Sequence, residues 1–406
     1  MAHHRHRSLH PLLLTALKFS PLVGVLGHRQ VGKTTLLSQI GKAYFALDDE
    51  ESVANQIDTA PEFLREVAGP KPVAIDEAQL MPSLFPALKE WVRKHKAPGQ
   101  FLLSGSIRFT SKKSIQESLT GRIVNYELLP LTINELLEVD APELLPKAHL
   151  SLDLEIFLKS FPVEKTEIKR RLKALKDYEI FGGLPGICFV RNEKIRIGRI
   201  ASQIDTLLDR DLRMLCTTQL GLMELKEILS KLADSSGQEV KLSELSTRKR
   251  MNSTSLNKIL DALEALFIIR RIPIVGYKRG SVVFFEDIAE QKAIQITEND
   301  LKKTQLQMLF SIVRAAFAYR EGEFPSFAQF QTRGGSMVPI CVRSKEGVSG
   351  FIPIADVKPS RSERASAKSF FAAFRNAKVF YVYNGMVDCE SIDDRQCVLS
   401  LAHLTL

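Results

Sequence analysis

The sequence predicts an α/β fold with a parallel sheet near the N-terminus, followed by a helical region and a second mixed α/β segment. Three observations predict this class. Short apolar runs alternate with amphipathic stretches up to about residue 105, as in a parallel sheet covered by helices on both faces. Strand patterns then disappear over residues 138–235 and return beyond residue 268. The length of 406 residues also favours roughly two to three domains over one core.

Composition and charge exclude several classes of protein. With 45% hydrophobic and 25% charged residues, the chain is expected to fold rather than to be disordered or fibrous. No run reaches the 18 or so uncharged apolar residues of a membrane-spanning helix. Five cysteines without a C-x-x-C pair argue against a disulfide framework or structural zinc site and favour the cytoplasm. The net charge of +9 permits an anionic partner.

The N-terminal elements follow from local patterns. We expect a short amphipathic helix over residues 7–20, a buried strand over 21–26 and, after a glycine-containing loop, a helix over 35–42. Apolar runs of strand type follow at residues 44–47, 72–76 and 100–104. Amphipathic helices are expected between them, at residues 62–68 and 83–96. Strands and helices therefore alternate, with connections short enough for right-handed crossovers.

Later elements divide the rest of the chain. Helices are expected at residues 150–160, 164–180, 193–220 and 222–233, with a break at Phe181-Gly-Gly-Leu-Pro-Gly186. After Ser235-Ser-Gly237, helices at 242–246 and 253–267 precede strands at 268–275 and 281–285, an order that resembles a winged helix-turn-helix. A helix at 301–320, strands at 327–331, 337–342 and 351–357, a helix at 365–375 and a strand at 378–383 complete the pattern. We therefore predict domains at 1–140, 141–235, 236–285 and 286–406.

The first glycine loop carries a phosphate-binding pattern. Residues 27–34 read G-x-x-x-x-G-K-T between a predicted strand and a predicted helix, which is the context of a P-loop. The backbone N–H groups of such a loop and the helix N-terminus attract phosphate oxygens. Lys33 is expected to neutralise the β and γ phosphates, and Thr34 to bind magnesium. The predicted nucleotide-binding residues are Gly27, His28, Arg29, Gln30, Val31, Gly32, Lys33, Thr34 and Thr35.

Two acids supply the complementary half of the site. Asp76 ends the apolar strand that begins near Pro72, and Glu77 follows it. Asp76 is predicted to complete the magnesium shell, while Glu77 is placed to polarise a water for in-line attack on the γ phosphate. The sequence thus predicts an ATPase that uses magnesium.

These motifs resemble those of prokaryotic AAA+ ATPases that carry a C-terminal domain of unknown function. The resemblance covers about 120 residues and rests on six stretches: Gly27-His-Arg-Gln-Val-Gly-Lys-Thr-Thr-Leu36, Tyr44-Phe-Ala-Leu-Asp48, Val73-Ala-Ile-Asp-Glu-Ala-Gln79, Phe101-Leu-Leu-Ser-Gly-Ser106, Leu119-Thr-Gly-Arg122 and Leu128-Leu-Pro-Leu-Thr-Ile-Asn-Glu135. Phe181-Gly-Gly-Leu-Pro185 and Leu208-Asp-Arg-Asp211 match more weakly. The resemblance implies a P-loop nucleotide-binding core, a helical region and a winged helix, with ATP preferred over GTP.

The same similarity suggests further catalytic residues. Ser106, or alternatively Ser104, would sense the γ phosphate. Arg122 is the candidate for the arginine that stabilises transition-state charge, with Arg108 as its competitor. If Arg122 acts in trans, the active form is a homo-oligomer.

The basic segment at residues 241–280 allows two interpretations. It holds nine lysines and arginines against three acids. Arg248-Lys-Arg250 precedes a candidate recognition helix that offers Ser253, Thr254, Ser255, Asn257 and Lys258. This set is able to contact double-stranded DNA, but winged helices also serve as protein-contact modules.

The C-terminal segment departs from the pattern of its relatives, which resembles a degenerate restriction-endonuclease fold. Ser311 replaces the first acid of that pattern, Met337 and Pro339 stand at the second, and only Asp356-Val-Lys358 remains. A metal-dependent nuclease needs two or more carboxylates around magnesium. We therefore expect a structural role or a protein-binding role for this segment, and no nuclease activity.

Together these features predict an ATPase whose nucleotide cycle moves the winged-helix and C-terminal domains, with DNA as a candidate partner. The alternative is an ATP-dependent protein-binding scaffold or sensor with slow hydrolysis. A small-molecule P-loop kinase is disfavoured, because Asp76-Glu77 suits water activation and no acceptor-binding motif is present.

Overall fold

The N-terminal part of the chain forms a five-stranded parallel sheet. The computed structural model describes residues 5–49, 59–109, 119–151, 153–161, 163–246, 252–297, 300–320, 325–344 and 347–406. The strands are β1 (Leu22–Leu26), β2 (Ala43–Ala46), β3 (Val73–Asp76), β4 (Phe101–Gly105) and β5 (Ile123–Glu127), in the order β2-β3-β4-β1-β5. Every pair within this sheet is parallel, which confirms the predicted α/β architecture.

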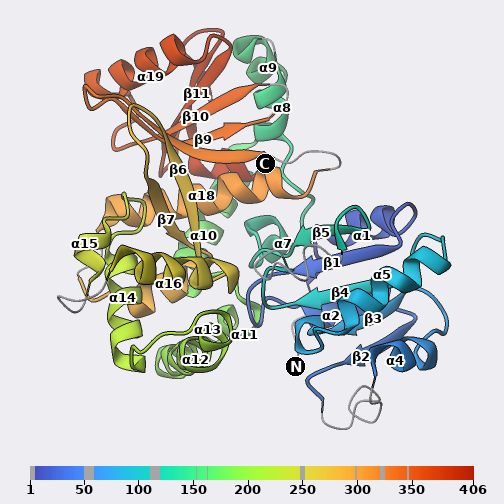
Figure 1. Cartoon of the computed structure of the whole chain (residues 1–406). Coiled ribbons are helices and arrows are strands. Elements are labelled where there is room, and N and C mark those ends of the chain that lie inside the picture. Colours follow the sequence, from blue (N-terminus) through green and yellow to red (C-terminus); the bar gives the residue numbers. More distant parts are fainter. Residues whose placement is uncertain are drawn as a thin grey trace.

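Helices cover both faces of this sheet, as its alternating side chains require. On one face α1 (His10–Ala16) and α2 (Lys33–Ile40) share a core with Val23, Val25 and Leu102. On the other face, α4 (Ala60–Glu66) and α5 (Leu84–Lys94) pack against Leu22 and Leu103, which alternate along β1 and β4 with the residues of the first face. Figure 1 shows this half in blue and cyan. A 3-10 turn, η1 (Ala78–Leu80), follows β3.

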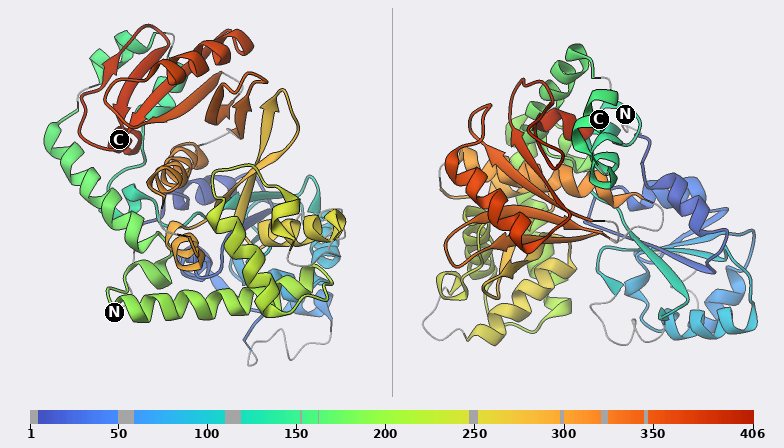
Figure 2. Two further views of the ribbon diagram at one scale, coloured as in Figure 1. Left: turned by 90° about the vertical axis from the view of Figure 1, so that its left-hand side faces the viewer. Right: turned by 90° about the horizontal axis from the view of Figure 1, so that it is seen from above.

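A second sheet of eight strands lies in the other half of the molecule (Figure 2). Its order is β12-β13-β11-β10-β9-β8-β6-β7. The strands are β6 (Ile269–Gly276), β7 (Ser281–Phe285), β8 (Ser326–Gln331), β9 (Met337–Arg343), β10 (Val348–Ile354), β11 (Ala377–Tyr383), β12 (Glu390–Ser391) and β13 (Gln396–Ser400). The β6–β7 hairpin belongs to the predicted winged helix, yet β6 also pairs in parallel with β8. The sheet therefore runs across the predicted boundary at residue 285.

Helices also cover the two faces of the second sheet. On one face lie α18 (Leu301–Ala318) and the C-terminal turn η4 (Leu401–Thr405), together with α8 (Leu144–Leu150) and α10 (Lys165–Phe181) from the helical region. On the other face lies α19 (Arg361–Ala373), whose Phe370 packs on Phe330 and Tyr381. α9 (Leu154–Ser160) contacts β12 and β13. The first part of the helical region is therefore built into the C-terminal sheet.

The remaining helices pack mainly into the hydrophobic core that contains α1 and α2. They are α7 (Ile133–Leu137), α11 (Pro185–Cys188), α12 (Glu193–Thr206), α13 (Leu212–Leu215), α14 (Leu222–Asp234), α15 (Leu242–Leu245), α16 (Ser253–Ala265) and α17 (Ile288–Ile294). The helix predicted over residues 193–220 is wrong in its extent, because a π-helical turn, η3 (Leu207–Asp211), separates α12 from α13 and the helix ends at Leu215. The wider turn cannot be read from a 3.6-residue apolar period.

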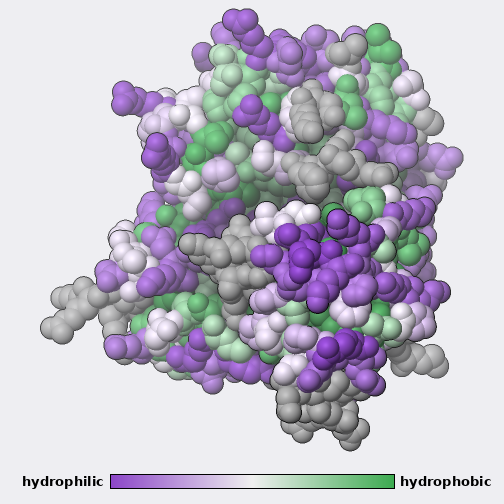
Figure 3. Space-filling view, turned by 45° about the vertical axis from the view of Figure 1, so that its right-hand side comes forward, coloured by the Kyte–Doolittle hydropathy of each residue, from purple (hydrophilic) through white to green (hydrophobic). Residues whose placement is uncertain are grey.

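Over the ranges given above, the structure contains no helix of the length and apolar character needed to cross a membrane. The face in Figure 3 is mostly hydrophilic, with hydrophobic residues in separate groups.

Candidate active site at the P-loop

The P-loop lies at the carboxyl edge of the first sheet, as predicted. It joins the end of β1, the strand between β4 and β5, to the start of α2. Gly32 has φ 100°, a left-handed conformation that favours glycine, and directly precedes Lys33 at the start of α2. The loop amides and the N-terminus of α2 are therefore available to phosphate oxygens.

Lys33 is buried beneath this loop. Its Nζ donates hydrogen bonds to the carbonyl oxygens of Gly27 (3.1 Å) and His28 (3.0 Å). The pKa of Lys33 is lowered, mainly by burial and to a smaller extent by the charge of Arg29. The carboxylates of Glu77 and Asp76 act in the opposite direction but do not outweigh burial. The ammonium group and the two acids thus lie within electrostatic reach of one another, as a triphosphate site with magnesium requires.

Asp76 sits where magnesium would bind. Its Oδ2 accepts hydrogen bonds from Thr34 Oγ1 (2.6 Å) and from Tyr44 Oη (2.7 Å). Its Oδ1 accepts from Ser104 Oγ and from the backbone N–H of Glu77 (3.1 Å). Thr34 and Asp76 present adjacent oxygens, the ligands that magnesium prefers. Since the described residues contain no cluster of three or more His, Cys, Asp or Glu side chains, phosphate oxygens and water would complete the shell.

Glu77 occupies a strained position next to Asp76. Its φ of 52° and ψ of 43° place a non-glycine residue in the left-handed region. Its Oε2 accepts hydrogen bonds from Ser106 Oγ (3.0 Å) and from Gln79 Nε2. Gln79 Nε2 also donates to Ser106 Oγ (3.2 Å). Backbone strain of this kind clusters at functional sites, and here it turns the carboxylate toward the end of β4.

Two serines at the end of β4 contact different carboxylates. Ser104, in the strand, donates to the carboxylate of Asp76. Ser106, one residue beyond the strand, donates to the carboxylate of Glu77. Ser106 as γ-phosphate sensor stays a prediction, and its position beside Glu77 supports it over Ser104.

The two candidate arginines lie at opposite edges of the sheet. Arg122 immediately precedes β5, and Ile123 pairs with Leu22 at the start of β1. At ~3.3 Å per residue, this is about 13 Å from the end of the strand where the P-loop begins. Arg122 therefore faces away from the P-loop of its own chain, and only its role in trans stays a prediction. Arg108 lies at the P-loop edge, paired with Glu127 at 3.1 Å.

Three successive P-loop side chains contact distant parts of the chain. His28 Nε2 forms an ion pair with Glu290 Oε2 of α17 at 3.1 Å, and both residues are buried. Arg29 Nη1 donates to Asp211 Oδ2 of η3 at 3.0 Å. A Cβ added at Gly186 would lie 2.6 Å from Gln30 Oε1, so this glycine allows α11 to approach the loop.

The N-terminal segment holds the same loop from another side. Arg7 is buried and donates to the carbonyl oxygens of Val31 (2.7 Å) and Leu129 (2.5 Å). Its Nε lies 3.2 Å from Glu135 Oε1 of α7. The P-loop is thus fixed by Arg7, α11, η3 and α17 as well as by its own sheet.

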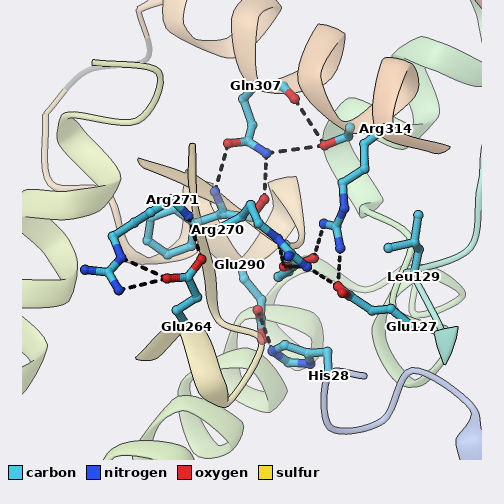
Figure 4. A network of polar contacts seen from close by, with 12 residues as sticks. His28, Glu127, Leu129, Glu264, Arg270, Arg271, Glu290, Gln307 and Arg314 are labelled. Atoms are coloured by element: carbon cyan, nitrogen blue, oxygen red, sulfur yellow. Dashed lines mark hydrogen bonds and ion pairs between the residues drawn. The ribbon is translucent and has the colours of Figure 1, made fainter. Parts of the chain in front are cut away.

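A network of buried charges joins the two halves beside the P-loop. Figure 4 shows Arg270 of β6 and Arg314 of α18 converging on Glu127 at the end of β5, with His28 and Glu290 nearby. Both arginines also pair with Glu286, which follows β7. The guanidinium groups, despite desolvation, hold the pKa of Glu127 well below its usual range.

Sequence reasoning did not identify several of these residues. Tyr44 and Gln79 belong to stretches that resemble AAA+ ATPases, but the sequence alone assigned them no role. Arg7, Asp211 and Glu290 are far from the P-loop in sequence, and Arg29 and Asp211 are 182 positions apart. Only Asp211 had a signal, through the weakly matching stretch that begins at Leu208.

The basic segment is less free than its sequence count suggests. Arg270 and Arg271 point into ion pairs, the latter with Asp261 and Glu264. Lys241 pairs with Glu244, and Lys278 with Glu239. Arg248-Lys-Arg250 lies outside the described residues. The exposed face of α16 keeps the predicted polar side chains, which are Ser253, Thr254, Ser255, Asn257 and Lys258.

Within the described part of the C-terminal segment, Asp356 belongs to no cluster of three or more His, Cys, Asp or Glu side chains. Asp356 and Lys358 are exposed and follow β10 rather than lying in it, so the strand predicted over residues 351–357 ends early, at Ile354. Asp356 Oδ1 accepts from the N–H of Val357 (2.7 Å). Ser311 hydrogen-bonds to Gln307 within α18.

Comparison with known proteins assigns two segments to families. Residues 20–137 match an AAA domain, and residues 172–283 match a domain of unknown function (DUF8612). The first match contains β1, the P-loop, Asp76, Glu77 and Ser106, so the site lies within the segment that is similar to an AAA domain. The second match spans α10 to β7 without the last part of the chain.

Relatives among curated proteins are themselves uncharacterized. One from Mycobacterium bovis and one from Mycobacterium tuberculosis are each 27% identical over 261 residues, which is 64% of this chain and 51% of the relative. A protein from Methanocaldococcus jannaschii is 26% identical over 198 residues, or 46% of this chain and 41% of the relative. The chain thus spans about half the length, or less, of these relatives.

Solved structures give only remote likenesses. The Walker-type ATPase PABY2304 of Pyrococcus abyssi has 15% identity and a TM-score of 0.41, covering 71% of this chain and 94% of that protein. A signal transduction ATPase with numerous domains and a tetratricopeptide repeat sensor from Pyrococcus horikoshii has 13% identity and a TM-score of 0.26, covering 79% and 48%. At these scores neither likeness carries weight for this chain.

Proposed function

We propose that this protein hydrolyses ATP with magnesium and uses nucleotide occupancy to move the helical, winged-helix and C-terminal segments. The P-loop carries this proposal, because its two ends have different partners. Lys33 and Thr34 lie beside Asp76 and Glu77. At the other end of the loop, His28 pairs with Glu290 of α17, and Arg29 pairs with Asp211 of η3. A loop that closes around phosphates would therefore shift contacts with both α17 and η3.

The residues have separate roles in this proposal. Thr34 and Asp76 hold magnesium, which supplies charge stabilisation to the phosphates when bound. Lys33 binds the β and γ phosphates, and Glu77 accepts a proton from the attacking water. Ser106 orients the Glu77 carboxylate through its 3.0 Å hydrogen bond.

Two substitutions test hydrolysis. We expect Lys33→Ala to abolish ATP binding measured by calorimetry. Glu77→Gln should bind ATP normally but hydrolyse it at least about 100-fold more slowly, the low end of the effect of a general base. Absence of ATP binding by the folded parent protein, or full turnover by Glu77→Gln, contradicts the proposal.

A second candidate function is an ATP-dependent scaffold or sensor with slow hydrolysis, which binds a protein through its C-terminal segment. The position of Glu77 favours it, because Gln79 and Ser106 both donate to its Oε2, so that this oxygen is less available to receive a proton from water. Duplex DNA distinguishes the two functions. A motor acting on DNA is expected to raise its turnover when duplex is added, whereas a scaffold keeps the same low rate.

A further inference from the structure

Arg29 lies in the P-loop and has no role in the mechanism above. Its side chain is about one-third exposed, and its guanidinium donates to Asp211 Oδ2 at 3.0 Å. Arg29 lies four positions before Lys33, within the loop whose amides are available to phosphate oxygens. It is therefore a second cation of the P-loop, and it is contributed by the same chain.

The other arginines near the sheet are poorly placed for this task. Arg122 lies at the opposite edge of the sheet, before β5. Arg108 is paired with Glu127 and lies 4.3 Å from the ring centroid of Phe267. Arg29 instead sits in the loop that surrounds the phosphates and is held by one carboxylate.

Asp211 has the geometry of a positioning residue. It is buried in the π-helical turn η3, and its second oxygen, Oδ1, accepts from Arg210 Nε at 2.7 Å. The carboxylate thus holds two guanidinium groups, one from the P-loop and one from its own turn. Asp209, two positions earlier in the same turn, is exposed and pairs with Arg213 at 3.2 Å. It has no contact of this kind with the loop.

We propose that Arg29 contacts the γ phosphate of bound ATP, and that Asp211 positions Arg29 and transmits this contact to η3, α12 and α13. The inference rests on the proposed function, since it requires ATP at the P-loop. A phosphate group competes well for a guanidinium, because both form charge-assisted hydrogen bonds of similar geometry. ATP would draw Arg29 away from Asp211, whereas ADP lacks the γ oxygens and would leave the pair intact.

The ratio of ATP to ADP affinity tests Arg29. We expect Arg29→Gln to weaken ATP binding about tenfold, equivalent to about 1.4 kcal/mol, while the Kd for ADP changes little. Arg29→Lys should restore part of the preference, because it keeps the charge without the fork. An equal loss for ATP and ADP would assign Arg29 a merely structural role and overturn the proposal.

Hydrogen exchange tests Asp211, with Asp209→Asn as the matched control. In the parent protein and in Asp209→Asn, ATP but not ADP should change the exchange of residues 199–215. In Asp211→Asn this response should disappear, although ATP still binds. A response retained in Asp211→Asn overturns the transmitting role. Failure of the parent protein to bind ATP would instead contradict the proposed function, so the two failures are distinguishable.

Discussion

Asp76 shows how single residues prepare a site for magnesium. Each of its carboxylate oxygens accepts two hydrogen bonds, and the donors come from α2, β2, β4 and the backbone after β3. A carboxylate held in this way loses little conformational entropy when it binds a metal or a metal-bound water. Tyr44 is the donor with no other assigned role. Burial and the hydrogen bond to Asp76 both raise the pKa of its phenol.

Removing the Tyr44 hydroxyl should loosen this arrangement. We expect Tyr44→Phe to raise the magnesium concentration that half-saturates ATP binding by about tenfold, the low end for loss of a group that orients a metal ligand. Magnesium titrations followed by calorimetry at fixed ATP measure this. Tyr277→Phe, at a half-exposed side chain, is the control. Equal magnesium dependence in both variants would show that Tyr44 does not orient Asp76.

Local motifs account for what the sequence predicted at this scale. Lys33, Thr34, Asp76 and Glu77 follow from short patterns next to strands, and the structure brings them together as expected. Tyr44 could not be assigned, because its role depends on β2 pairing beside β3. The hydrogen bond from Gln79 to Glu77 depends on the left-handed backbone conformation of Glu77, which no sequence pattern predicts.

At the scale of elements, α17 meets the P-loop through a buried ion pair. Burial alone would lower the pKa of His28, but the charge and hydrogen bond of Glu290 outweigh it, so the pKa is raised above its usual 6.5. Gln203 Nε2 donates to Glu290 Oε1 at 3.0 Å. Burial and the charge of Glu290 also raise the pKa of nearby Asp287 to about 6.

This pair should make stability depend on pH above 6.5. A raised pKa means that the protonated pair stabilises the folded state fully below pH 6.5, and that this contribution is lost as pH rises through the pKa of folded His28. We expect Glu290→Gln to cost about 3 kcal/mol at pH 6.5, the range for breaking a buried pair, and clearly less at pH 9. Urea denaturation across this range measures it. A constant difference would show that His28 is uncharged.

A control keeps the comparison specific to His28. Glu179→Gln removes a carboxylate that pairs with Lys292 of the same helix α17 at 2.8 Å. Since neither partner titrates as a histidine does, its effect should stay level from pH 6.5 to 9.

The elements themselves were predicted unevenly. β1, β3 and β4 are fully buried and read clearly as apolar runs. β5 was missed, because Ile123-Val-Asn-Tyr-Glu127 is a half-buried edge strand with polar positions. α17 was missed as well, since three of its seven residues are polar and two of these, Glu290 and Gln291, are buried against other helices.

At the scale of the whole molecule, a network of buried charges near Glu127 connects the first half to the second sheet, beside apolar residues of both halves that share one core. Arg108 and Glu127 belong to the first half, and Arg270, Glu286 and Arg314 to the second. The sequence could not predict this contact, because β5, β6 and α18 meet only in the folded chain. It also explains why the local excess of positive charge was a weak sign of DNA binding.

Breaking this network should separate the two halves. Glu127→Gln removes the carboxylate shared by Arg108, Arg270 and Arg314, and leaves Glu286 paired with Arg270 and Arg314. We expect a loss of about 3 kcal/mol, as when one partner of a buried pair is removed. The loss should fall on the contact between the halves, so that one thermal transition divides into two. Scanning calorimetry measures this, with Glu143→Gln as the control.

The control removes the same carboxylate from an exposed pair with Lys147, within one helical segment of the second half. Surface pairs of this kind contribute little, so the thermal profile should match that of the parent. ATP should partly restore a single transition in Glu127→Gln. Ligand binding stabilises the nucleotide-binding half by mass action, which brings the midpoint of its unfolding closer to that of the second half. A single, unshifted transition in Glu127→Gln would show that the halves are joined elsewhere, through the contacts of α11, η3 and α17 with the P-loop.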